Sequence, residues 1–419
     1  VKIEAEYIMP VEVHNPMELH SIIAYWQEED KVIVYDKTQG VKSTQRSVMN
    51  AFKLTEDKVQ VISKFVGGGF GSALRTWPHE VAALIGAKMT GKPVKLMLTR
   101  DQMFTNVGYR PYTVQRIALG ASADGKLMGI SHEADSITSS YEEFTEGTVN
   151  FSRSFYACPN VDTRYKVYPL NVGTPTWMRG PGEATGAFAL ECAMDELAHE
   201  LKMDPIELRL INYAETDPER NRPFSSKFLK EAYEMGAERI GWKARNTAIG
   251  SMKEGEWMVG YGMGSGMFNA SRGTAKALAR FFPDGTLLVQ SAVSDSGPGT
   301  ATAMTQIAST TMGIPAKKIT FELGDSSYPP GPTQGGSTTT STLGSAVNDV
   351  CISLKKKLFE LAKENSIFHT ENIHNVTFED LVFENGAIAL ASDKTRRVTY
   401  ADLLKNAGIA QLEVIEESK

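Results

Sequence analysis

Residues 66–75 have the sequence Val-Gly-Gly-Gly-Phe-Gly-Ser-Ala-Leu-Arg, and this glycine cluster is the most informative stretch of the chain. An apolar, strand-like run at 59–66 comes before it, and a helix pattern begins at Pro78 after it. Glycine has no Cβ, so the backbone N–H groups of such a turn can approach a ligand closely and adopt positive φ angles without penalty. The pattern predicts an anionic or oxo-rich ligand, although a purely structural tight turn fits it about as well.

The composition bounds what the chain can be. A length of 419 residues leaves room for two or more domains, each with its own core. Apolar residues make up 42% and charged residues 22%, which is typical of a globular protein, and no apolar run is long enough to span a bilayer. The net charge of −6 and a single short basic run at 355–357 argue against a general nucleic-acid binder. We therefore expect no membrane span and no nucleic-acid partner.

The cysteines and histidines give no local metal motif. Cys158, Cys192 and Cys351 lie far apart, so their spacing cannot assemble an iron-sulfur cluster or a structural zinc site. His14 and His20 flank a proline turn without a third ligand nearby, which favours a structural role for both. The sequence thus predicts no metal site built from side chains, and any iron-sulfur centre must lie on another chain.

The order of strand and helix patterns predicts an α+β protein. The chain begins directly on a strand pattern at 1–7, without Met or a signal-like segment, which indicates an internal fragment or a processed chain. In the first half, strands are expected at 21–26, 31–35, 58–66, 93–98 and 114–121, and helices at 43–54, 78–90, 186–201, 204–212 and 227–240. We place a domain boundary near Arg245, after the last of these helices.

The second half repeats the order of the first. Strands are expected at 259–267, 276–282 and 286–292, with an Asp284-Gly285 hairpin turn. A turn of small residues at 295–300, Asp-Ser-Gly-Pro-Gly-Thr, then leads into a helix at 301–312. The first N–H groups of a helix are unpaired and lie at its positive end, so this arrangement is an anion site in principle. A plain helix start capped by Asp295 and Thr300 is the alternative.

A third loop is rich in hydroxyl groups. Residues 333–341 read Thr-Gln-Gly-Gly-Ser-Thr-Thr-Thr-Ser and precede a helix expected to begin near Leu343. Hydroxyl-rich turns are common in solvated loops, yet five such residues in a row are unusual. Two glycine turns and one hydroxyl-rich loop together indicate a large ligand that bears phosphate.

Six segments in this order resemble the molybdenum-cofactor-binding subunit of the xanthine oxidase family of molybdenum hydroxylases. They are residues 7–20, 38–40, 66–72, 179–183, 294–306 and 336–347. The order and spacing of all six are more specific than any one of them. Residues 14–18 and 110–111 look most like bacterial aldehyde oxidoreductases of the three-subunit type. The resemblance implies two related mixed α/β cofactor-binding domains, 1–245 and 246–419, with the cofactor between them and the second domain incomplete at its C-terminus.

The resemblance also implies roles for individual residues. Gln39 matches a glutamine whose amide hydrogen-bonds an oxo ligand on molybdenum, and Phe70 and Gly71 match backbone that approaches the metal. Arg179 matches an arginine near the cofactor and substrate cavity, with a structural ion pair as the alternative. The other residues expected to bind the cofactor are Gly68, Gly69, Arg272, Gly297, Gly299, Thr300, Gln306, Ser337, Thr338, Thr339, Thr340 and Ser341.

Two departures from the family pattern stand out. The second glycine turn has Gly297-Pro298-Gly299 where many relatives have Gly-Gln-Gly, so a side-chain amide contact to the pterin is lost or replaced. The family's general base is a glutamate in a Gly-x-Gly-Glu motif near the C-terminus of the subunit, and the chain stops at Lys419 before that region. The similar motif at 180–183 belongs to the arginine segment, so we expect Glu183 to be a capping or supporting carboxylate.

The implied activity is the oxidation of an aldehyde or N-heterocycle with water as the oxygen source. The cofactor would be molybdenum-molybdopterin in its cytosine dinucleotide form, with 2Fe-2S and FAD on an iron-sulfur subunit and an FAD subunit. The fragment alone is expected to be inactive, in the cytoplasm or in the periplasm with a signal-bearing partner, and homodimerisation is left open. The alternatives are a cofactor-binding module whose base lies on another chain or a missing segment, and a non-enzymatic scaffold.

Overall fold

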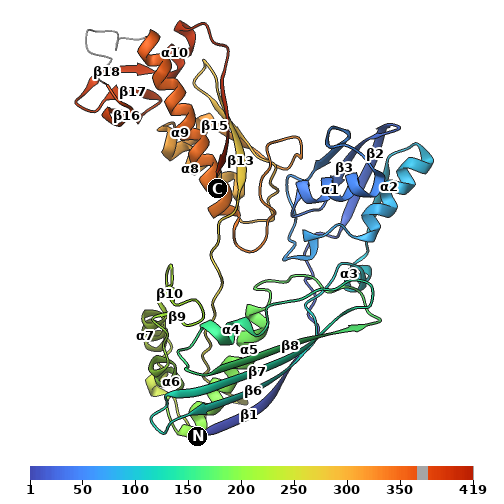
Figure 1. The fold of residues 1–419 in the computed structure, drawn as a ribbon, viewed down its shortest axis with the longest axis vertical. Coiled ribbons are helices and arrows are strands. Elements are labelled where there is room, and N and C mark those ends of the chain that lie inside the picture. Colours follow the sequence, from blue (N-terminus) through green and yellow to red (C-terminus); the bar gives the residue numbers. More distant parts are fainter. Residues whose placement is uncertain (366–375, 419) are drawn as a thin grey trace. The chain divides into compact units, whose positions relative to one another are not determined.

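The computed structural model of the chain describes residues 1–365 and 376–418, which form two compact units (Figure 1). Unit 1 comprises Val1–Val13 and Gly108–Phe268, and unit 2 comprises His14–Val107 and Asn269–Lys419. The predicted α+β class is confirmed, because both units combine helices with sheets. The predicted boundary near residue 245 separates two cofactor-binding domains, which are not the same division as these compact units, and it stays a prediction. No helix in the described part of the chain is both long and apolar enough to cross a membrane.

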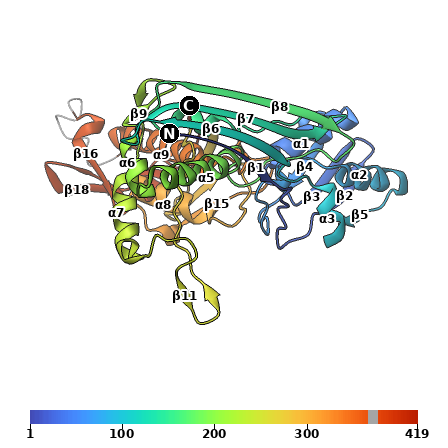
Figure 2. The same ribbon diagram turned by 90° about the horizontal axis from the view of Figure 1, so that it is seen from below.

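Unit 1 is built on a four-stranded sheet with the order β1-β6-β7-β8. β7 pairs antiparallel with β6 and parallel with β8, and β1 pairs antiparallel with β6. The strands are β1 (Lys2–Met9), β6 (Thr113–Ala121), β7 (Leu127–Ser139) and β8 (Val161–Leu170), the helices are α4 (Asn150–Ser154), α5 (Glu183–Leu201), α6 (Pro205–Ile211) and α7 (Leu229–Arg239), and the short elements are β9 (Thr216–Asp217), β10 (Arg222–Pro223), η3 (Trp242–Ala244), β11 (Lys253–Glu254) and β12 (Trp257–Met258). Figure 2 shows α5 lying along the sheet.

The core of unit 1 lies between α5 and the sheet. Leu190, Met194 and Leu197 recur at helical spacing on one side of α5 and pack with Ile117 and Leu119 of β6. The next helix, α6, begins as the sequence predicts, with Pro205 in its first turn. Its cap is the Asp204 carboxylate, which accepts the N–H of Ile206 at 2.8 Å.

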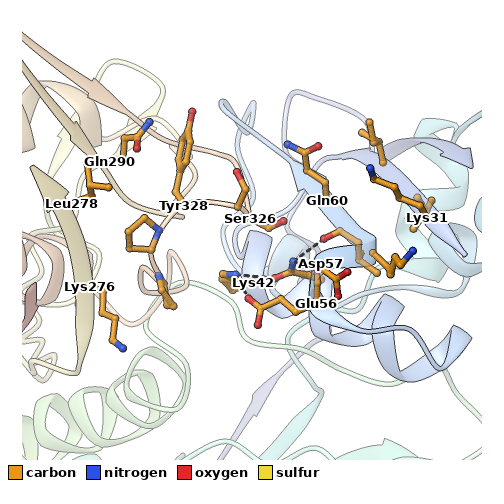
Figure 3. Close-up of a pocket in the computed structure, with 18 of the residues that line it drawn as sticks. Lys31, Lys42, Glu56, Asp57, Gln60, Lys276, Leu278, Gln290, Ser326 and Tyr328 are labelled. Carbon is orange, nitrogen blue, oxygen red and sulfur yellow. Dashed lines mark hydrogen bonds and ion pairs between the residues drawn. The ribbon is translucent and has the colours of Figure 1, made fainter. Parts of the chain in front are cut away.

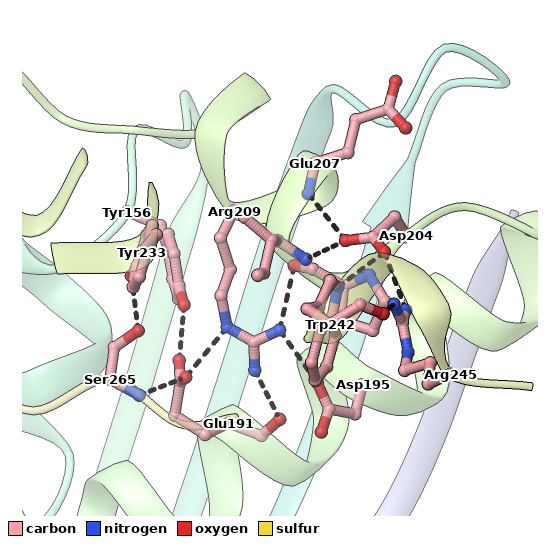
Figure 4. Close-up of polar contacts among 12 residues, drawn as sticks. Tyr156, Glu191, Asp195, Asp204, Glu207, Arg209, Tyr233, Trp242, Arg245 and Ser265 are labelled. Atoms are coloured by element: carbon pink, nitrogen blue, oxygen red, sulfur yellow. Dashed lines mark hydrogen bonds and ion pairs between the residues drawn. The ribbon is translucent and has the colours of Figure 1, made fainter. Parts of the chain in front are cut away.

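A buried ionic network ties α5, α6 and the end of unit 1 together (Figure 4). The Arg209 side chain is fully buried, and its Nε donates to Glu191 Oε2 at 2.9 Å. The Tyr156 hydroxyl donates to the other carboxylate oxygen of Glu191, and the N–H of Ser265 donates to Oε2 at 2.7 Å. Arg209 Nη1 also reaches Asp195 Oδ1 at 2.8 Å. The segment that leaves unit 1 is therefore fixed by a carboxylate on α5.

The first half of unit 2 is a four-stranded sheet with the order β4-β3-β2-β5. β2 and β3 form an antiparallel hairpin, β4 lies parallel to β3, and β5 lies antiparallel to β2. The elements are β2 (Ser21–Glu28), β3 (Lys31–Asp36), α1 (Val41–Phe52), η1 (Glu56–Lys58), β4 (Val59–Ile62), η2 (Ser72–Leu74), α2 (Pro78–Thr90), β5 (Val94–Met97) and α3 (Arg100–Asn106). The predicted helix at 78–90 is confirmed, with Pro78 in its first turn and Gly91 at its end.

The second half of unit 2 has the same strand arrangement, with the order β15-β14-β13-β19. Again the first two strands are antiparallel, the third is parallel to the second, and the last is antiparallel to the first. The elements are β13 (Ala275–Phe281), β14 (Leu287–Gln290), α8 (Thr300–Met312), η4 (Ala316–Lys318), β15 (Ile319–Glu322), α9 (Thr339–Asn365), η6 (Phe378–Asp380), β16 (Leu381–Glu384), β17 (Ala387–Leu390), β18 (Asp393–Thr399), α10 (Tyr400–Asn406) and β19 (Leu412–Ser418). In both halves the loops after the second and third strands lead into helices.

Two predicted elements of the second half of the sequence differ from the structure. The strand expected at 259–267 is absent, because glycines at 260, 262, 264 and 266 leave alternate positions without a side chain to pack. The helix expected near Leu343 begins at Thr339, so part of the hydroxyl-rich loop forms its first turn.

The network around Arg209 generates a stability prediction. Glu191→Ala leaves a buried guanidinium without its buried carboxylate, so we expect the free energy of unfolding to fall by about 3–5 kcal/mol. Asp195→Ala is the matched control, because the Asp195 side chain is 42% exposed and should cost at most about 1 kcal/mol. Urea unfolding followed by tryptophan fluorescence measures both, and equal losses would contradict the assignment.

His132 of β7 generates a pH prediction. Its ring nitrogens lie 2.7 Å from Ser152 Oγ and 3.1 Å from Gln115 Oε1, and burial lowers its pKa to about 4. The unfolded chain binds a proton at His132 below pH 6.5, whereas the folded chain does not until about pH 4, so folding stability falls as the pH drops through this window. Between pH 6.5 and about pH 4, the free energy of unfolding of the wild type should fall by about 1.4 kcal/mol more per pH unit than that of His132→Gln. Urea titrations at several pH values measure this free energy, and equal slopes against pH for the two proteins would contradict the prediction.

Candidate functional site

We define residues 66–72, which follow β4, as the glycine turn. Side chains from the segment between β3 and α1, residues 37–40, contact this turn and fix it. Lys37 Nζ donates to the Gly68 carbonyl at 2.7 Å. Gln39 Oε1 accepts the N–H of Gly71 at 3.1 Å, and the Gln39 N–H donates to the carbonyl of Ala73 at 2.8 Å. Two side chains that are two residues apart therefore fix both ends of the turn.

The backbone of the glycine turn adopts left-handed conformations. Gly68 has φ +86°, Phe70 +57° and Gly71 +117°. The value for Phe70 costs roughly 1–2 kcal/mol because a side chain is present, so contacts around the turn must hold it in place. Glu18 provides one of these contacts, since its Oε2 accepts the N–H of Gly67 at 2.7 Å. The Phe70 ring is 40% exposed.

Gln334 joins three loops of unit 2 and is the site residue that the sequence did not single out. Its N–H donates to the Gln39 carbonyl at 2.7 Å, and its carbonyl accepts from Gln39 Nε2 at 2.5 Å. Its side-chain oxygen accepts the N–H of Ser296 at 2.9 Å, and its Nε2 donates to Thr300 Oγ1 at 2.6 Å. Gln334 thus connects the segment before α1 with the second glycine turn, residues 295–300.

The second glycine turn is capped from within. Asp295 accepts the N–H of Gly297 at 2.9 Å, of Gly299 at 3.3 Å and of Thr300 at 2.7 Å. The capping alternative of the sequence interpretation is therefore what the structure shows. These donors are occupied, and the two glycines contribute space instead, because a Cβ built at Gly297 would meet no atom within 4 Å. The Asp295 carbonyl also accepts the N–H of Val66 at 2.7 Å, which joins the two glycine turns.

The hydroxyl-rich loop, residues 333–341, runs into α9. Ser337 has a positive φ of +56°, and Thr338 Oγ1 donates to the Gly335 carbonyl at 3.2 Å. Thr339 and Thr340 begin α9, and Ser341 Oγ lies on its first turn, where it donates to the carbonyl of residue 271 at 2.6 Å.

Two further predicted residues belong to this half, Arg272 on the segment before β13 and Gln306 on α8. Arg272 is exposed, and its Nη1 lies 3.5 Å from Ser345 Oγ near the start of α9. Gln306 lies on the exposed side of α8, well inside the helix and away from its N-terminal glycine. The structure therefore brings Gln39 and the glycine turns together, whereas Gln306 is not part of that cluster.

Arg179 belongs to unit 1, on the loop that precedes α5. Arg110 is buried and donates from Nη2 to the carbonyls of Met178 at 3.0 Å and Arg179 at 2.7 Å. On the other side of the loop, Glu146 Oε2 accepts the N–H of Gly182 at 3.2 Å. Burial raises the pKa of Glu146 to about 6, against the opposing charge of Arg110. Glu183, expected to be a capping carboxylate, is the first residue of α5.

Buried basic groups lie under the glycine turn. His20 Nε2 lies 3.0 Å from Ser72 Oγ, and burial lowers the pKa of His20 to about 2 and that of His79 to about 4. The two rings meet edge to face at 6.0 Å. Burial also lowers the pKa of Lys37 to about 8. Across the described ranges, no group of three or more His, Cys, Asp and Glu residues could hold a metal ion.

A separate cavity of about 920 Å³ is lined by both halves of unit 2 (Figure 3). Three of its four lysines are engaged with nearby acids: Lys42 contacts Glu56 at 2.6 Å, Lys58 contacts Asp30 at 3.1 Å, and Lys276 contacts Glu417 at 3.1 Å. None of the predicted site residues lines it. The cavity is therefore distinct from the cluster around Gln39, and its paired charges give no strong preference for an anion.

The close packing of Gly69 against Gln39 generates a prediction. A Cβ at Gly69 would lie 2.3 Å from Gln39 Oε1, so Gly69→Ala must displace the amide and should cost about 1–3 kcal/mol of folding free energy. In a Gln39→Ala background the clash is gone, so the same change should cost much less. Urea unfolding of the double-mutant cycle measures the difference, and additive losses would exclude the contact. Gly120→Ala, where a Cβ meets nothing within 4 Å, is the control.

With this geometry established, comparison with known proteins places the chain. A family model described as "Molybdopterin cofactor-binding domain" matches residues 1–213, and a second model with the same description matches residues 235–418. The aldehyde oxidoreductase molybdenum-binding subunit PaoC of Escherichia coli O157:H7 is 34% identical over 92% of this chain and 53% of its own length. The putative xanthine dehydrogenase molybdenum-binding subunit XdhA of Escherichia coli K12 is 27% identical over 76% of this chain and 44% of its own length.

Solved structures share the fold along the whole chain. Quinoline 2-oxidoreductase from Pseudomonas putida 86 matches with a TM-score of 0.83 at 19% identity, and the match covers all of this chain and 57% of that one. Aldehyde oxidoreductase from Desulfovibrio gigas matches with a TM-score of 0.74 at 21% identity, over all of this chain and 44% of that one. The chain spans about half the length of the curated relatives it matches. Family models over both halves show that the chain belongs to the molybdenum-cofactor-binding subunits of the xanthine dehydrogenase and aldehyde oxidoreductase family.

Proposed function

We propose that the chain is the cofactor-binding part of a molybdenum hydroxylase that oxidises an aldehyde or an N-heterocycle with water as the source of oxygen. The similarity to PaoC, which is named an aldehyde oxidoreductase, favours an aldehyde. The observation that supports the proposal most is the cluster in which Gln39 joins the glycine turn to Gln334. It brings three loops of small residues, far apart in sequence, to one place.

The residues present fit a large oxo- and phosphate-bearing cofactor. Gly297 faces open space, and the Ser294 hydroxyl beside the same turn is buried without a hydrogen-bond partner in the described part of the chain. Gln39 Nε2 has two N–H groups and gives one of them to Gln334. Open space beside Gly297, a second amide N–H on Gln39 and the buried Ser294 hydroxyl would accommodate oxo and phosphate oxygens without adding charge.

The chain's own residues would bind and orient, while a molybdenum-pterin cofactor supplies the redox chemistry when bound. Gln39 would direct its amide donor at an oxo group, and the backbone of Phe70 and Gly71 would limit how close other groups come. Arg179, with its loop fixed by Arg110, would attract an electron-rich part of the substrate or transition state. Gly68, Gly69, Arg272, Gly297, Gly299, Thr300, Gln306 and residues 337–341 stay proposed cofactor contacts.

The remaining assignments are proposals of the same kind. The pterin would carry a cytosine dinucleotide, and electrons would leave to 2Fe-2S and FAD centres on partner subunits. This placement is proposed because Cys158, Cys192 and Cys351 are too far apart in sequence to form a local iron-sulfur motif. We propose a cytoplasmic complex and expect these 419 residues alone not to turn over substrate. A cofactor-binding module without catalysis of its own is the alternative, with the base glutamate on a different segment or chain.

The test is made on the complete native complex. We expect stoichiometric molybdenum by mass spectrometry, a cytosine nucleotide released on acid treatment, and ¹⁸O from labelled water in the carboxylate formed from an aldehyde. Gln39→Glu keeps the acceptor for Gly71 but removes the amide donor, so turnover should fall on the order of a hundredfold. Gln27→Ala, on the exposed part of β2, is the control. A freshly matured wild-type complex without molybdenum would overturn the proposal.

A further inference from the structure

We propose that Lys37 is a positioning residue of this site, whose buried ammonium fixes the glycine turn through Gly68 and places a positive charge behind it. The identity of the ligand in this inference rests on the proposed function. The clamp on the turn rests on the geometry alone.

The geometry of the clamp is specific. Lys37 Nζ donates to the Gly68 carbonyl at 2.7 Å, and the Lys37 residue is 4% exposed. The two preceding peptide units are held by Glu18, because the Gly67 carbonyl accepts the N–H of Glu18 at 3.0 Å and the Gly67 N–H donates to Glu18 Oε2 at 2.7 Å. An ammonium and a carboxylate from separate segments thus hold the peptide units 68–69 and 66–67, shortly before strained Phe70.

The placement of a lysine here is costly, which indicates that it has a use. Burying an ammonium costs several kcal/mol unless an acid pairs with it. Within the described ranges, no carboxylate oxygen lies within 4.0 Å of Lys37 Nζ, and its hydrogen-bond acceptor is a neutral carbonyl. Two acids lie near it: Glu18, which already accepts the N–H of Gly67, and the neighbouring Asp36, whose pKa burial raises to about 7. The charge is therefore only partly compensated by protein groups.

Arg100, a second cation near this segment, has a different role. Arg100 donates to the Asn15 side chain at 2.8 Å and to the carbonyls of Pro16 at 2.7 Å and Met17 at 2.9 Å. It thus folds the segment that presents Glu18 to the turn. Lys37, by contrast, contacts the glycine turn itself and lies two residues before Gln39 on the same loop.

A fixed positive charge beside an oxo-rich metal group has a defined effect. It stabilises the reduced, more negative state of the centre and so raises its reduction potential. The hydrogen bond to Gly68 is a separate effect, since it holds the backbone that approaches the ligand. Arginine can retain the charge, and methionine, of similar length, retains neither charge nor donor.

The experiment compares wild type, Lys37→Met and Lys37→Arg in the complete complex. Hydrogen exchange of the peptide covering residues 66–72, measured on cofactor-free and loaded protein, should be faster in Lys37→Met than in wild type. The reduction potential of the molybdenum centre, from titration followed by electron paramagnetic resonance, should be lower in Lys37→Met and close to wild type in Lys37→Arg. Lys64→Met, an exposed lysine next to the turn, is the matched control and should change neither measurement.

The outcomes separate the two proposals. Unchanged exchange in Lys37→Met overturns the clamp, whether or not metal is bound. Equal potentials in Lys37→Met and wild type overturn the electrostatic role, and equal shifts in both Lys37 variants reduce it to packing. If Lys37→Met does not load the cofactor, the exchange data on cofactor-free protein and the potential of Lys37→Arg still decide. Absence of molybdenum from the wild type would instead remove the proposed function and leave the clamp to the exchange experiment.

Discussion

The arrangement of unit 2 depends on a reciprocal pair of hydrogen bonds between Gln39 and Gln334. Each residue donates one hydrogen bond to the other and accepts one from it, although they are 295 positions apart in sequence, and both are buried. A buried amide that loses its partner costs about 1–3 kcal/mol, so neither loop can shift without disturbing the other. The Gln39 side chain also accepts the N–H of Gly71, and the Gln334 side chain also accepts the N–H of Ser296. These two side chains therefore connect the two glycine turns.

The two halves of unit 2 use equivalent loops for this purpose. In each half the loop after the second strand meets the loop after the third strand through a glutamine side-chain oxygen that accepts a backbone N–H. The halves differ in what they expose. The first presents strained backbone at Phe70, and the second presents open space at Gly297, where Asp295 satisfies the helix start. The two halves thus share a strand arrangement but differ in the backbone and space that their glycine turns present.

Local signals made much of the fold predictable from the sequence, and long-range contacts limited the rest. The helix at 78–90 was recognisable from Pro78 and Gly91, which set its ends by local chemistry. The strand expected at 259–267 is absent because every second residue there is glycine, so one face of such a strand would have no side chains to pack. Gln39 could be found through a family motif, whereas Gln334 could not be singled out, since its importance lies in partners that only the folded chain brings to it. The buried position of Lys37 has no sequence signal either.

The discontinuity of the units has a consequence for synthesis on the ribosome. β1 is made before its partner β6, which follows only after the whole first half of unit 2 has been translated. Closing so long a loop carries an entropic cost that grows slowly with its length, so β1 waits as an unpaired strand while β2 to β5 can already form their own sheet. Unit 1 is then completed before any residue of the second half of unit 2 exists. Gln39 therefore lacks its partner Gln334 until the second half of unit 2 has been translated.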